Sequence, residues 1–296
     1  MTGVGLSLPQ LGPGIDGKLV RTFCREAETA GFTSLWVQEH IFFPQSSTSP
    51  YAGIPGSAAP EVYRSTLSAT ELLAAAAAYT RTCLIGTSVL VGGYHRPVEL
   101  AQRLATLDLI SEGRLVVGLG VGWSDEEHVQ MDVDPRQRGP RLTELVHALR
   151  TCWGPDPIEH HGVFFDIPLS YVSPKPVQRS IPLIAGTASR TGLARAVTSF
   201  DGWNPAGVPI ATVRRTLDDL NRQRAPHQDP LTAWPRLFAQ SPLGPPDLPR
   251  LFEEVNAARH AGMAEVIIDA GFWEEITEPS DWLRAIETFA TALDLH

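Results

Sequence analysis

Residues 95–123 read HRPVELAQRLATLDLISEGRLVVGLGVGW and contain one complete passage from a helix into a strand. Pro97 suits the first position of a helix, and leucines follow it at helical spacing on one face. Gly113 ends that helix, and residues 115–119 form a short apolar run typical of a buried strand. The stretch therefore predicts one unit of an alternating α/β fold.

The same alternation continues on both sides of this stretch. Expected strands cover residues 4–8, 34–37, 82–91, 115–119, 181–185, 202–204, 234–239 and 265–269. Expected helices cover residues 16–30, 67–79, 97–112, 141–153, 189–200, 210–224, 251–261 and 282–293. Strands that alternate with helices favour a parallel sheet, and eight such units favour a closed (β/α)8 barrel, a TIM barrel, over an open doubly wound sheet. We expect residues 1–296 to form a single barrel domain.

Two segments interrupt the alternation and are interpreted as insertions. Residues 41–63, after the second strand, contain four prolines and two glycines without any period, which is typical of a functional lid. Residues 155–180, before the fifth strand, contain an expected hairpin at 159–171.

Composition excludes several classes of function. The chain has a formal net charge of −9 and no run of basic residues, so nucleic acid is not an expected partner. Its three cysteines form no C-x-x-C pair, so neither a disulfide framework nor a zinc ribbon is expected, and a reducing compartment fits best. We see no signal peptide and no 18-residue apolar span, so a cytoplasmic protein without membrane contact is expected.

Polar residues follow the expected strands at the edge where barrel enzymes carry their active sites. His40 ends the second strand, and a histidine there suits proton transfer or donation to a ring carbonyl, although a lone histidine is also often structural. No histidines stand at metal-ligand spacing, so a metal site is not expected.

Two glycine-containing segments allow two interpretations each. Gly118, Gly120 and Gly122 alternate, so they either let a flat group approach the backbone or relieve a crowded barrel interior. Residues 186–189, Gly-Thr-Ala-Ser, precede an expected helix and predict either an anion site or an ordinary serine N-cap.

Taken together, the sequence resembles the luciferase-like oxidoreductases, in particular their coenzyme F420 (deazaflavin) branch. The resemblance rests on the order and spacing of five segments, at 27–40, 71–90, 95–123, 161–179 and 185–205. It implies a barrel with a cofactor ring across its mouth, and a bulge in the third strand with a cis peptide at Ser88–Val89. It also implies a homodimer.

The resemblance further implies functional residues and a reaction. The implied activity is an F420-dependent oxidoreductase that moves a hydride between the deazaflavin ring and a small organic substrate. The catalytic candidates are His40 together with Asp125 or Glu126. The implied cofactor-binding residues are Ser7, His40, Thr87, Ser88, Val89, Gly120, Gly122, Trp123, Gly186, Thr187, Ala188 and Ser189.

Two alternatives remain open from the sequence. The first is an FMN-dependent monooxygenase of the same superfamily, which would use reduced FMN and O2. The second is a barrel that binds a cofactor or ligand without catalysis. The substrate is not specified, but Trp36, Tyr51, Trp123 and Trp203 suggest a pocket for an apolar or planar molecule.

Overall fold

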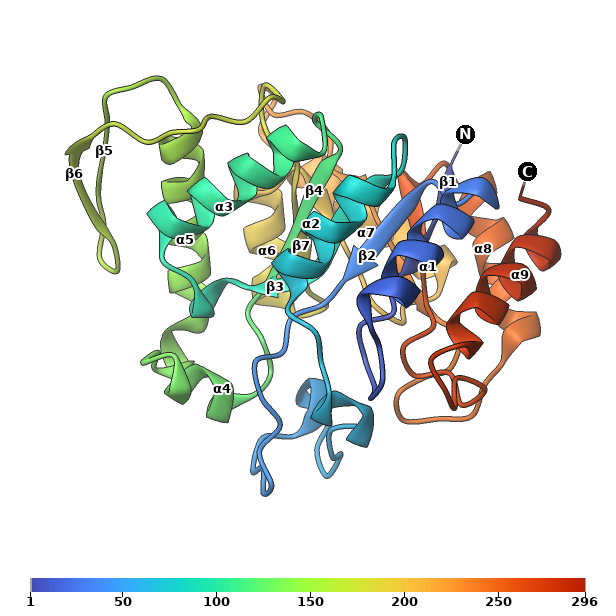
Figure 1. The fold of residues 1–296 in the computed structure, drawn as a ribbon. Helices are drawn as coiled ribbons and strands as arrows, with labels where there is room; N and C mark the ends of the chain where they lie inside the picture. The colour runs from blue at the N-terminus through green and yellow to red at the C-terminus, as the bar shows by residue number, and fades with distance from the viewer. Residues whose placement is uncertain (1, 296) are drawn as a thin grey trace.

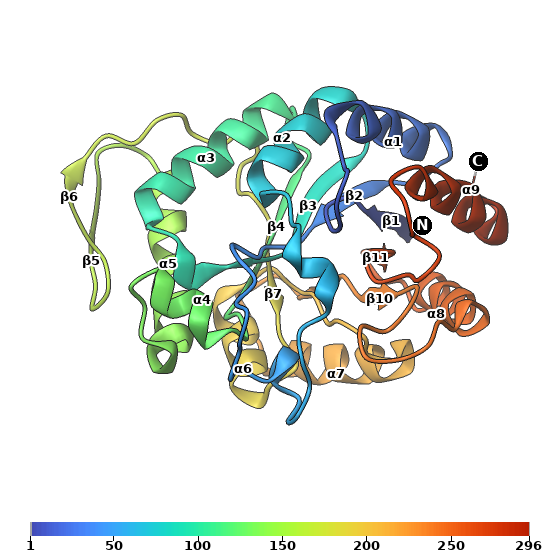
Figure 2. The ribbon, with the colours of Figure 1, turned by 60° about the horizontal axis from the view of Figure 1, so that its bottom comes forward.

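The computed structural model describes residues 2–295 and arranges them as a parallel sheet that curls inside a ring of helices (Figure 1, Figure 2). The sheet has nine strands in the order β10-β11-β1-β2-β3-β4-β7-β8-β9. Their bounds are β1 Gly3–Ser7, β2 Ser34–Val37, β3 Leu84–Val91, β4 Leu115–Gly120, β7 Leu183–Gly186, β8 Gly202–Trp203, β9 Thr232–Ala233, β10 Arg236–Phe238 and β11 Glu265–Asp269.

The two ends of the sheet, β9 and β10, are separated in the chain only by Trp234 and Pro235. Backbone bonds continue the pairing on both sides, from Trp234 N to the oxygen of Trp203 and from Ile267 N to the oxygen of Pro235, each 2.8 Å. The chain itself thus closes the sheet into a barrel. The strand predicted over 234–239 is present as β10, but it begins only at Arg236, and the sequence did not predict β9. Pro235 lies between the two strands because proline has no N–H to donate to a ladder.

A helix follows each strand of the barrel, with β9 and β10 together preceding one helix. These helices are α1 Gly17–Thr29, α2 Ala69–Tyr79, α3 Pro97–Ile110, α5 Arg138–Trp153, α6 Arg190–Ser199, α7 Ile210–Gln223, α8 Leu248–His260 and α9 Asp281–Leu293. The sequence did not predict the short helix α4, Asp125–Gln130, which follows β4. Ser189 does cap α6, since its hydroxyl oxygen accepts a hydrogen bond from Gly192 N at 3.1 Å.

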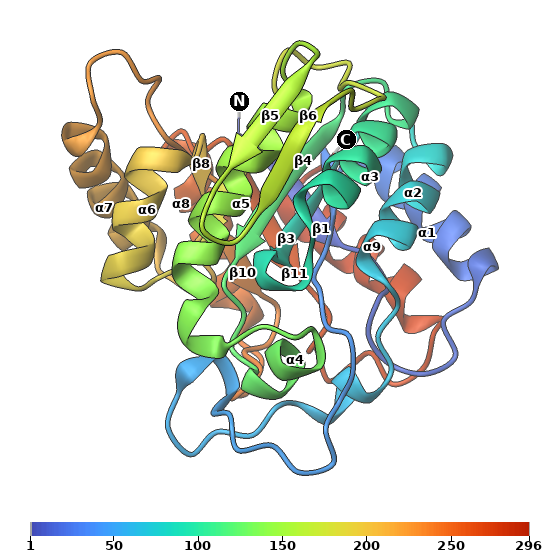
Figure 3. The same cartoon turned by 90° about the vertical axis from the view of Figure 1, so that its left-hand side faces the viewer.

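The two interrupting segments lie on different sides of the barrel. The lid segment, residues 41–63, crosses the barrel mouth and contains two short 3₁₀ turns, Tyr51–Gly53 and Glu61–Arg64 (Figure 2). The expected hairpin is present as the antiparallel pair β5, Ile158–His161, and β6, Asp166–Ser170. It lies outside α5 (Figure 3). It is attached there because the carboxylate of Glu144 accepts backbone N–H groups of its turn.

The third strand carries the irregularity that the family resemblance implies. The β3–β4 register shifts between Thr87 and Leu90, and the Ser88–Val89 peptide is cis, which confirms that expectation. The Val89 side chain fills space that two glycines leave open. A Cβ added at Gly120 would stand 2.6 Å from Val89 Cγ2, and one added at Gly186 would stand 2.5 Å from Cγ1.

The two glycines within β4, Gly118 and Gly120, are therefore best explained by a crowded interior. An added Cβ at Gly118 would stand 2.1 Å from the Thr87 carbonyl oxygen. Gly122 differs from Gly118 and Gly120: it lies beyond β4 with φ +70° and faces Val91 and His128. The expectation of three glycines on one face of a strand is thus wrong at the third position, because the strand ends at Gly120.

Two of the four aromatic residues suggested for a substrate pocket belong to the barrel core instead. Trp36 and Trp203 are 1% and 2% exposed. Trp36 lies against the face of Gly86, where an added Cβ would meet its ring at 2.3 Å. These rings fill the interior of the barrel and leave no surface for a ligand.

The structure also bears on cysteines, metals and membranes. All three cysteines are free and buried. Within residues 2–295, no group of three His, Cys, Asp or Glu side chains is placed to hold a metal ion. In the same part of the chain, no helix has the length and apolar character needed to cross a bilayer.

Packing of Val89 against the glycines can be tested by a double-mutant cycle. Gly120→Ala is expected to lower the free energy of unfolding by about 1–3 kcal/mol, because the new methyl overlaps the Val89 side chain. In a Val89→Ala background the same substitution should cost much less, since the overlapping methyl groups are gone. Urea unfolding of the four proteins measures both costs, and equal costs in the two backgrounds would contradict this packing.

Candidate active site

A histidine–carboxylate pair lies at the barrel mouth. His40 follows β2, and its Nδ1 is 3.2 Å from Oε2 of Glu127, a residue of α4 that is 87 positions away in the chain. The His40 side chain is 11% exposed and that of Glu127 only 2%. An ionised carboxylate can only accept, so Nδ1 must donate to it, and Nε2 is left for another partner.

Glu127 is held by three donors from two segments of the chain. Besides His40, it accepts a hydrogen bond from Ile41 N at 2.7 Å and from the Tyr94 hydroxyl at 3.0 Å. Burial raises the pKa of this carboxyl, but the bonds from His40 and Ile41 outweigh burial and leave the pKa below its ordinary value. Glu127 is therefore an ionised, positioned partner for His40 at neutral pH.

Aromatic rings enclose the His40 imidazole. The ring of Tyr63 lies 4.2 Å from it and that of Trp123 5.7 Å, between centroids. Tyr51 contacts both of these rings, and it forms a small apolar cluster with them that also includes Leu11 and Phe272. The lid segment thus covers His40 with its two buried tyrosines and separates it from bulk water.

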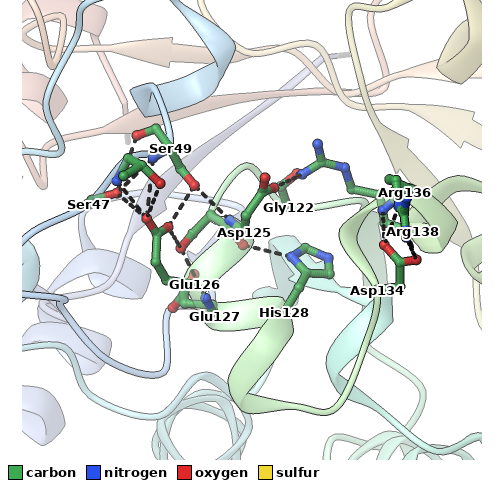
Figure 4. A network of polar contacts seen from close by, with 12 residues as sticks. Ser47, Ser49, Gly122, Asp125, Glu126, Glu127, His128, Asp134, Arg136 and Arg138 are labelled. Carbon is green, nitrogen blue, oxygen red and sulfur yellow. Dashed lines mark hydrogen bonds and ion pairs between the residues drawn. The ribbon is translucent and has the colours of Figure 1, made fainter.

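The first turn of α4 attaches the lid to the barrel (Figure 4). Glu126 accepts hydrogen bonds from Thr48 N at 2.7 Å and from the Ser49 hydroxyl at 2.6 Å. Asp125 instead pairs with Arg138 at 3.2 Å. Three consecutive acidic residues therefore have three different partners: Arg138, the lid and His40.

A buried polar network supports the β3 bulge from below. The Ser88 hydroxyl is 2.7 Å from the side-chain oxygen of Asn204, and the Ser88 carbonyl accepts from the Arg236 guanidinium. Arg236 is paired with Asp269, which is 1% exposed, and donates to Gln38 Oε1 at 2.9 Å. Burial opposes the charge of Arg236, but Asp269 more than compensates, so the arginine pKa is raised.

A cavity of about 600 Å³ opens at the start of α6 and is lined in part by Gly186, the neighbour of Val89. Its lining includes Gly186, Thr187 and Ser189, together with Arg138 and Arg195. The Thr187 carbonyl is fixed by the Trp203 indole N–H at 2.8 Å. First-turn N–H groups of a helix have no acceptor within the helix, so this cavity presents donors and positive charge to a ligand.

Arg195 lines this cavity without an ionic partner. Its Nε donates to Thr143 Oγ1 at 2.8 Å, and no carboxylate among residues 2–295 pairs with its guanidinium. Burial lowers its pKa without any compensating negative charge. A partly buried cation without a counter-charge is costly in a folded protein, and a bound anion would offset that cost.

Comparison with known proteins identifies the family. A family model described as luciferase-like monooxygenase matches residues 6–241. The chain belongs to that family. Its members are F420- or flavin-dependent oxidoreductases, so the predicted family and enzyme class are confirmed.

Relatives of this chain include an uncharacterized protein, an F420-dependent enzyme and a flavin-dependent enzyme. An uncharacterized protein of Mycobacterium tuberculosis is 34% identical over 200 residues, which is 66% of this chain and 71% of that protein. The F420-dependent glucose-6-phosphate dehydrogenase of Amycolatopsis mediterranei is 28% identical over 214 residues, 68% of this chain and 58% of that protein. The oxygenase component of the flavin-dependent trigonelline monooxygenase of Acinetobacter baylyi is 28% identical over 164 residues, 54% and 40% respectively.

A solved structure supports the luciferase-like fold. An F420-dependent secondary alcohol dehydrogenase superposes with a TM-score of 0.73 at 16% identity, covering 99% of both chains. At that identity the likeness concerns the fold alone. It agrees with the curled parallel sheet and its ring of helices.

The luciferase-like barrel brings many of the predicted site residues to its mouth, but not all. His40 contacts Trp123, while Ser88, Val89, Gly120 and Gly186 lie together at the bulge. Thr187 and Ser189 line the cationic cavity; the neighbouring Ala188 is exposed and is not among its lining residues.

Three other predicted residues have their polar groups occupied within the protein. The Thr87 hydroxyl is fully buried and donates to the Gly118 carbonyl at 2.7 Å. The Ser7 hydroxyl accepts from Ala270 N at 2.9 Å. The Gly122 carbonyl oxygen accepts a hydrogen bond from Arg138 Nη1 at 3.4 Å.

The acid that contacts His40 is neither of the two candidates from the sequence. Asp125 and Glu126 point to Arg138 and the lid, so Glu127 is the carboxylate at the site. A signal for it was present, because Ser124 and Glu127 stand at the spacing of a helix N-cap box. The Ser124 hydroxyl indeed accepts from Glu127 N at 3.1 Å, while the Glu127 carboxylate turns to His40.

Attachment of the lid by Glu126 predicts a dependence on pH. Burial raises its pKa, but the bonds from Ser49 and Thr48 together outweigh burial and lower that pKa to about 2. Because the pKa is lower in the folded protein, the attachment is fully present above the unfolded value, about 4.3, and is lost as pH falls toward 2.

Limited proteolysis of the lid segment tests this attachment. Glu126→Gln should be cleaved within residues 41–63 several-fold faster than the wild type at pH 7, because an amide accepts fewer and weaker bonds. Asp125→Asn on the same turn is the matched control and should behave as the wild type. Identical cleavage of Glu126→Gln and the wild type would contradict the assignment.

Proposed function

We propose that this chain is a coenzyme F420-dependent oxidoreductase that transfers a hydride between the deazaflavin ring and a small organic substrate. The observation that carries the proposal is the His40–Glu127 pair at the barrel mouth, where the neighbouring Glu39 N donates to the Val89 carbonyl of the bulge, together with a cationic cavity lined by Gly186, which also adjoins Val89. A proton-handling group and an anion-holding group thus flank one surface, as hydride transfer to an oxygen-bearing carbon requires.

The residues present fit the implied cofactor. Thr187, Ser189, Arg195 and the first turn of α6 would hold its phosphate, since they line a cavity with an uncompensated guanidinium. Ser88 and Val89 would back the ring, because Arg236 and Asn204 fix the bulge in place. When bound, a deazaflavin supplies a ring carbon that accepts or returns a hydride.

The remaining chemistry comes from the protein. His40 Nε2 takes a proton from the substrate hydroxyl during oxidation, or returns one to the carbonyl oxygen during reduction. Ionised Glu127 orients the ring through Nδ1 and compensates its positive charge. The buried tyrosines Tyr51 and Tyr63 exclude water from this transfer.

An FMN-dependent monooxygenase is the second candidate function. The family model is described as a monooxygenase, and one relative is a flavin-dependent monooxygenase component. The cationic cavity suits the FMN phosphate equally well. Cofactor binding therefore decides between the two candidates.

Fluorescence titration with coenzyme F420 and, separately, with FMN tests the cofactor assignment. We expect tight binding of F420 and weak binding of FMN. Preference for FMN would move the chain to the monooxygenase function, and binding of neither would favour a non-catalytic barrel.

Arg195→Met in the same titration tests the phosphate site and should weaken cofactor binding about tenfold or more, by removing a charged hydrogen-bond donor. Arg190→Met is the control, since Arg190 lies exposed on the same helix and outside the cavity lining. Equal losses in both variants would contradict the site. Gly186 is unsuitable for this test, because any side chain there meets Val89.

Substitution of the histidine pair tests the proton transfer. His40→Gln should lower kcat about a hundredfold or more and leave the cofactor Kd nearly unchanged. Glu127→Gln should lower kcat less than His40→Gln does, because the amide oxygen still accepts a hydrogen bond from Nδ1 but no longer carries the charge. An unchanged kcat in His40→Gln would remove this residue from the reaction.

A further inference from the structure

A second large cavity, of about 620 Å³, lies between the lid and the loops that follow β8 and β10. The size falls in the range of small-molecule sites, roughly 300–1,000 Å³. Its walls are mainly apolar and include Ile54, Val208, Phe238 and Leu243. This cavity is distinct from the cationic one at α6, because the two share no lining residue.

The cavity ends beside the candidate active site. Tyr51 lines it, and the Tyr51 ring lies 5.2 Å from Trp123 and 6.0 Å from Tyr63, both of which contact His40. One layer of aromatic rings thus lies between the cavity and the histidine. A substrate held in the cavity has its reacting end at this layer.

Charges in the cavity disfavour an anionic ligand. The lining contains two carboxylates, Asp247 and Glu254, and one guanidinium, that of the exposed Arg250. Neither of the two lysines of the chain, Lys18 and Lys175, is part of it. A phosphorylated or carboxylated substrate would therefore meet a net negative rim and no buried cation.

The entrance of the cavity is apolar. Ile54 from the lid is 49% exposed, and Leu243 from the loop before α8 is 47% exposed. Exposed apolar side chains on facing segments around an apolar cavity are typical of a site for an apolar ligand.

From these observations we infer that the cavity binds an uncharged, largely aliphatic alcohol or ketone as the substrate of the proposed oxidoreductase. The inference rests on the proposed function for its reaction. In oxidation, the Tyr51 ring would have to turn aside; the alcohol carbon would then give a hydride to the deazaflavin carbon and the hydroxyl its proton to His40, which leaves the ketone. Reduction of the ketone is the same step in reverse.

The probes for this inference are 2-alkanones from six to ten carbons and the carboxylates of equal length. Binding is measured by calorimetry on the protein without added cofactor, so the readout does not depend on turnover. We expect alkanone affinity to rise about fourfold for each added methylene, as burial in an apolar cavity requires. The carboxylates should bind at least tenfold more weakly.

Cavity-filling variants locate the binding. Leu243→Trp should abolish or strongly weaken alkanone binding, while Leu109→Trp should leave it unchanged. Leu109 is a matched control because it is 50% exposed on α3 and lies outside the lining. Val208→Phe fills the same cavity from the β8–α7 loop. It replaces Leu243→Trp as the cavity-filling variant if that protein does not fold.

The outcomes separate this inference from the cofactor assignment. Alkanone binding that is lost in Leu243→Trp supports the inference whatever the F420 titration gives. Carboxylates that bind as tightly as alkanones, or alkanone binding that survives both filling variants, would overturn it. Tight F420 binding without any alkanone binding would overturn the substrate class and leave the cofactor assignment intact.

Discussion

The packing of the Val89 side chain against glycines is the contact on which the site depends. Gly120 and Gly186 belong to β4 and β7, so this one side chain occupies the space where three neighbouring strands meet. The bulge that carries Val89 also presents the Ser88 carbonyl to Arg236. If any larger residue stood at these glycines, the bulge would have to move, and the ring-backing surface and the cationic cavity would move with it.

Helix α4 connects the parts of the site that lie around this bulge. Asp125 reaches Arg138, which lines the cationic cavity, and Glu126 holds the lid (Figure 4). Glu127 holds His40. One short helix thus contacts a residue of the cationic cavity, the lid and the histidine. A movement of the lid changes the environment of His40, because the lid supplies both Ile41 and the enclosing tyrosines.

Local patterns in the sequence account for most of the fold. The cap at Ser189, the proline at the start of α3 and the period of apolar residues predict most helices to within a few residues. Pro235 delays the start of the predicted strand, because a proline in a short strand removes a ladder donor. The spacing from Ser124 marks Glu127 as a cap-box residue, but its contact with His40, 87 residues away, is not specified by any local pattern.

The two large cavities differ in charge, and this difference has a consequence for orientation. The cavity at α6 offers an uncompensated guanidinium, while the cavity under the lid has a net negative lining. The anionic tail of a cofactor would be attracted to the cavity at α6 and repelled from the cavity under the lid. This difference favours one orientation, with the tail at α6 and the ring toward the bulge. An uncharged substrate meets no such penalty under the lid. Electrostatics and apolar burial thereby favour different cavities for the anionic tail of a cofactor and for an uncharged substrate.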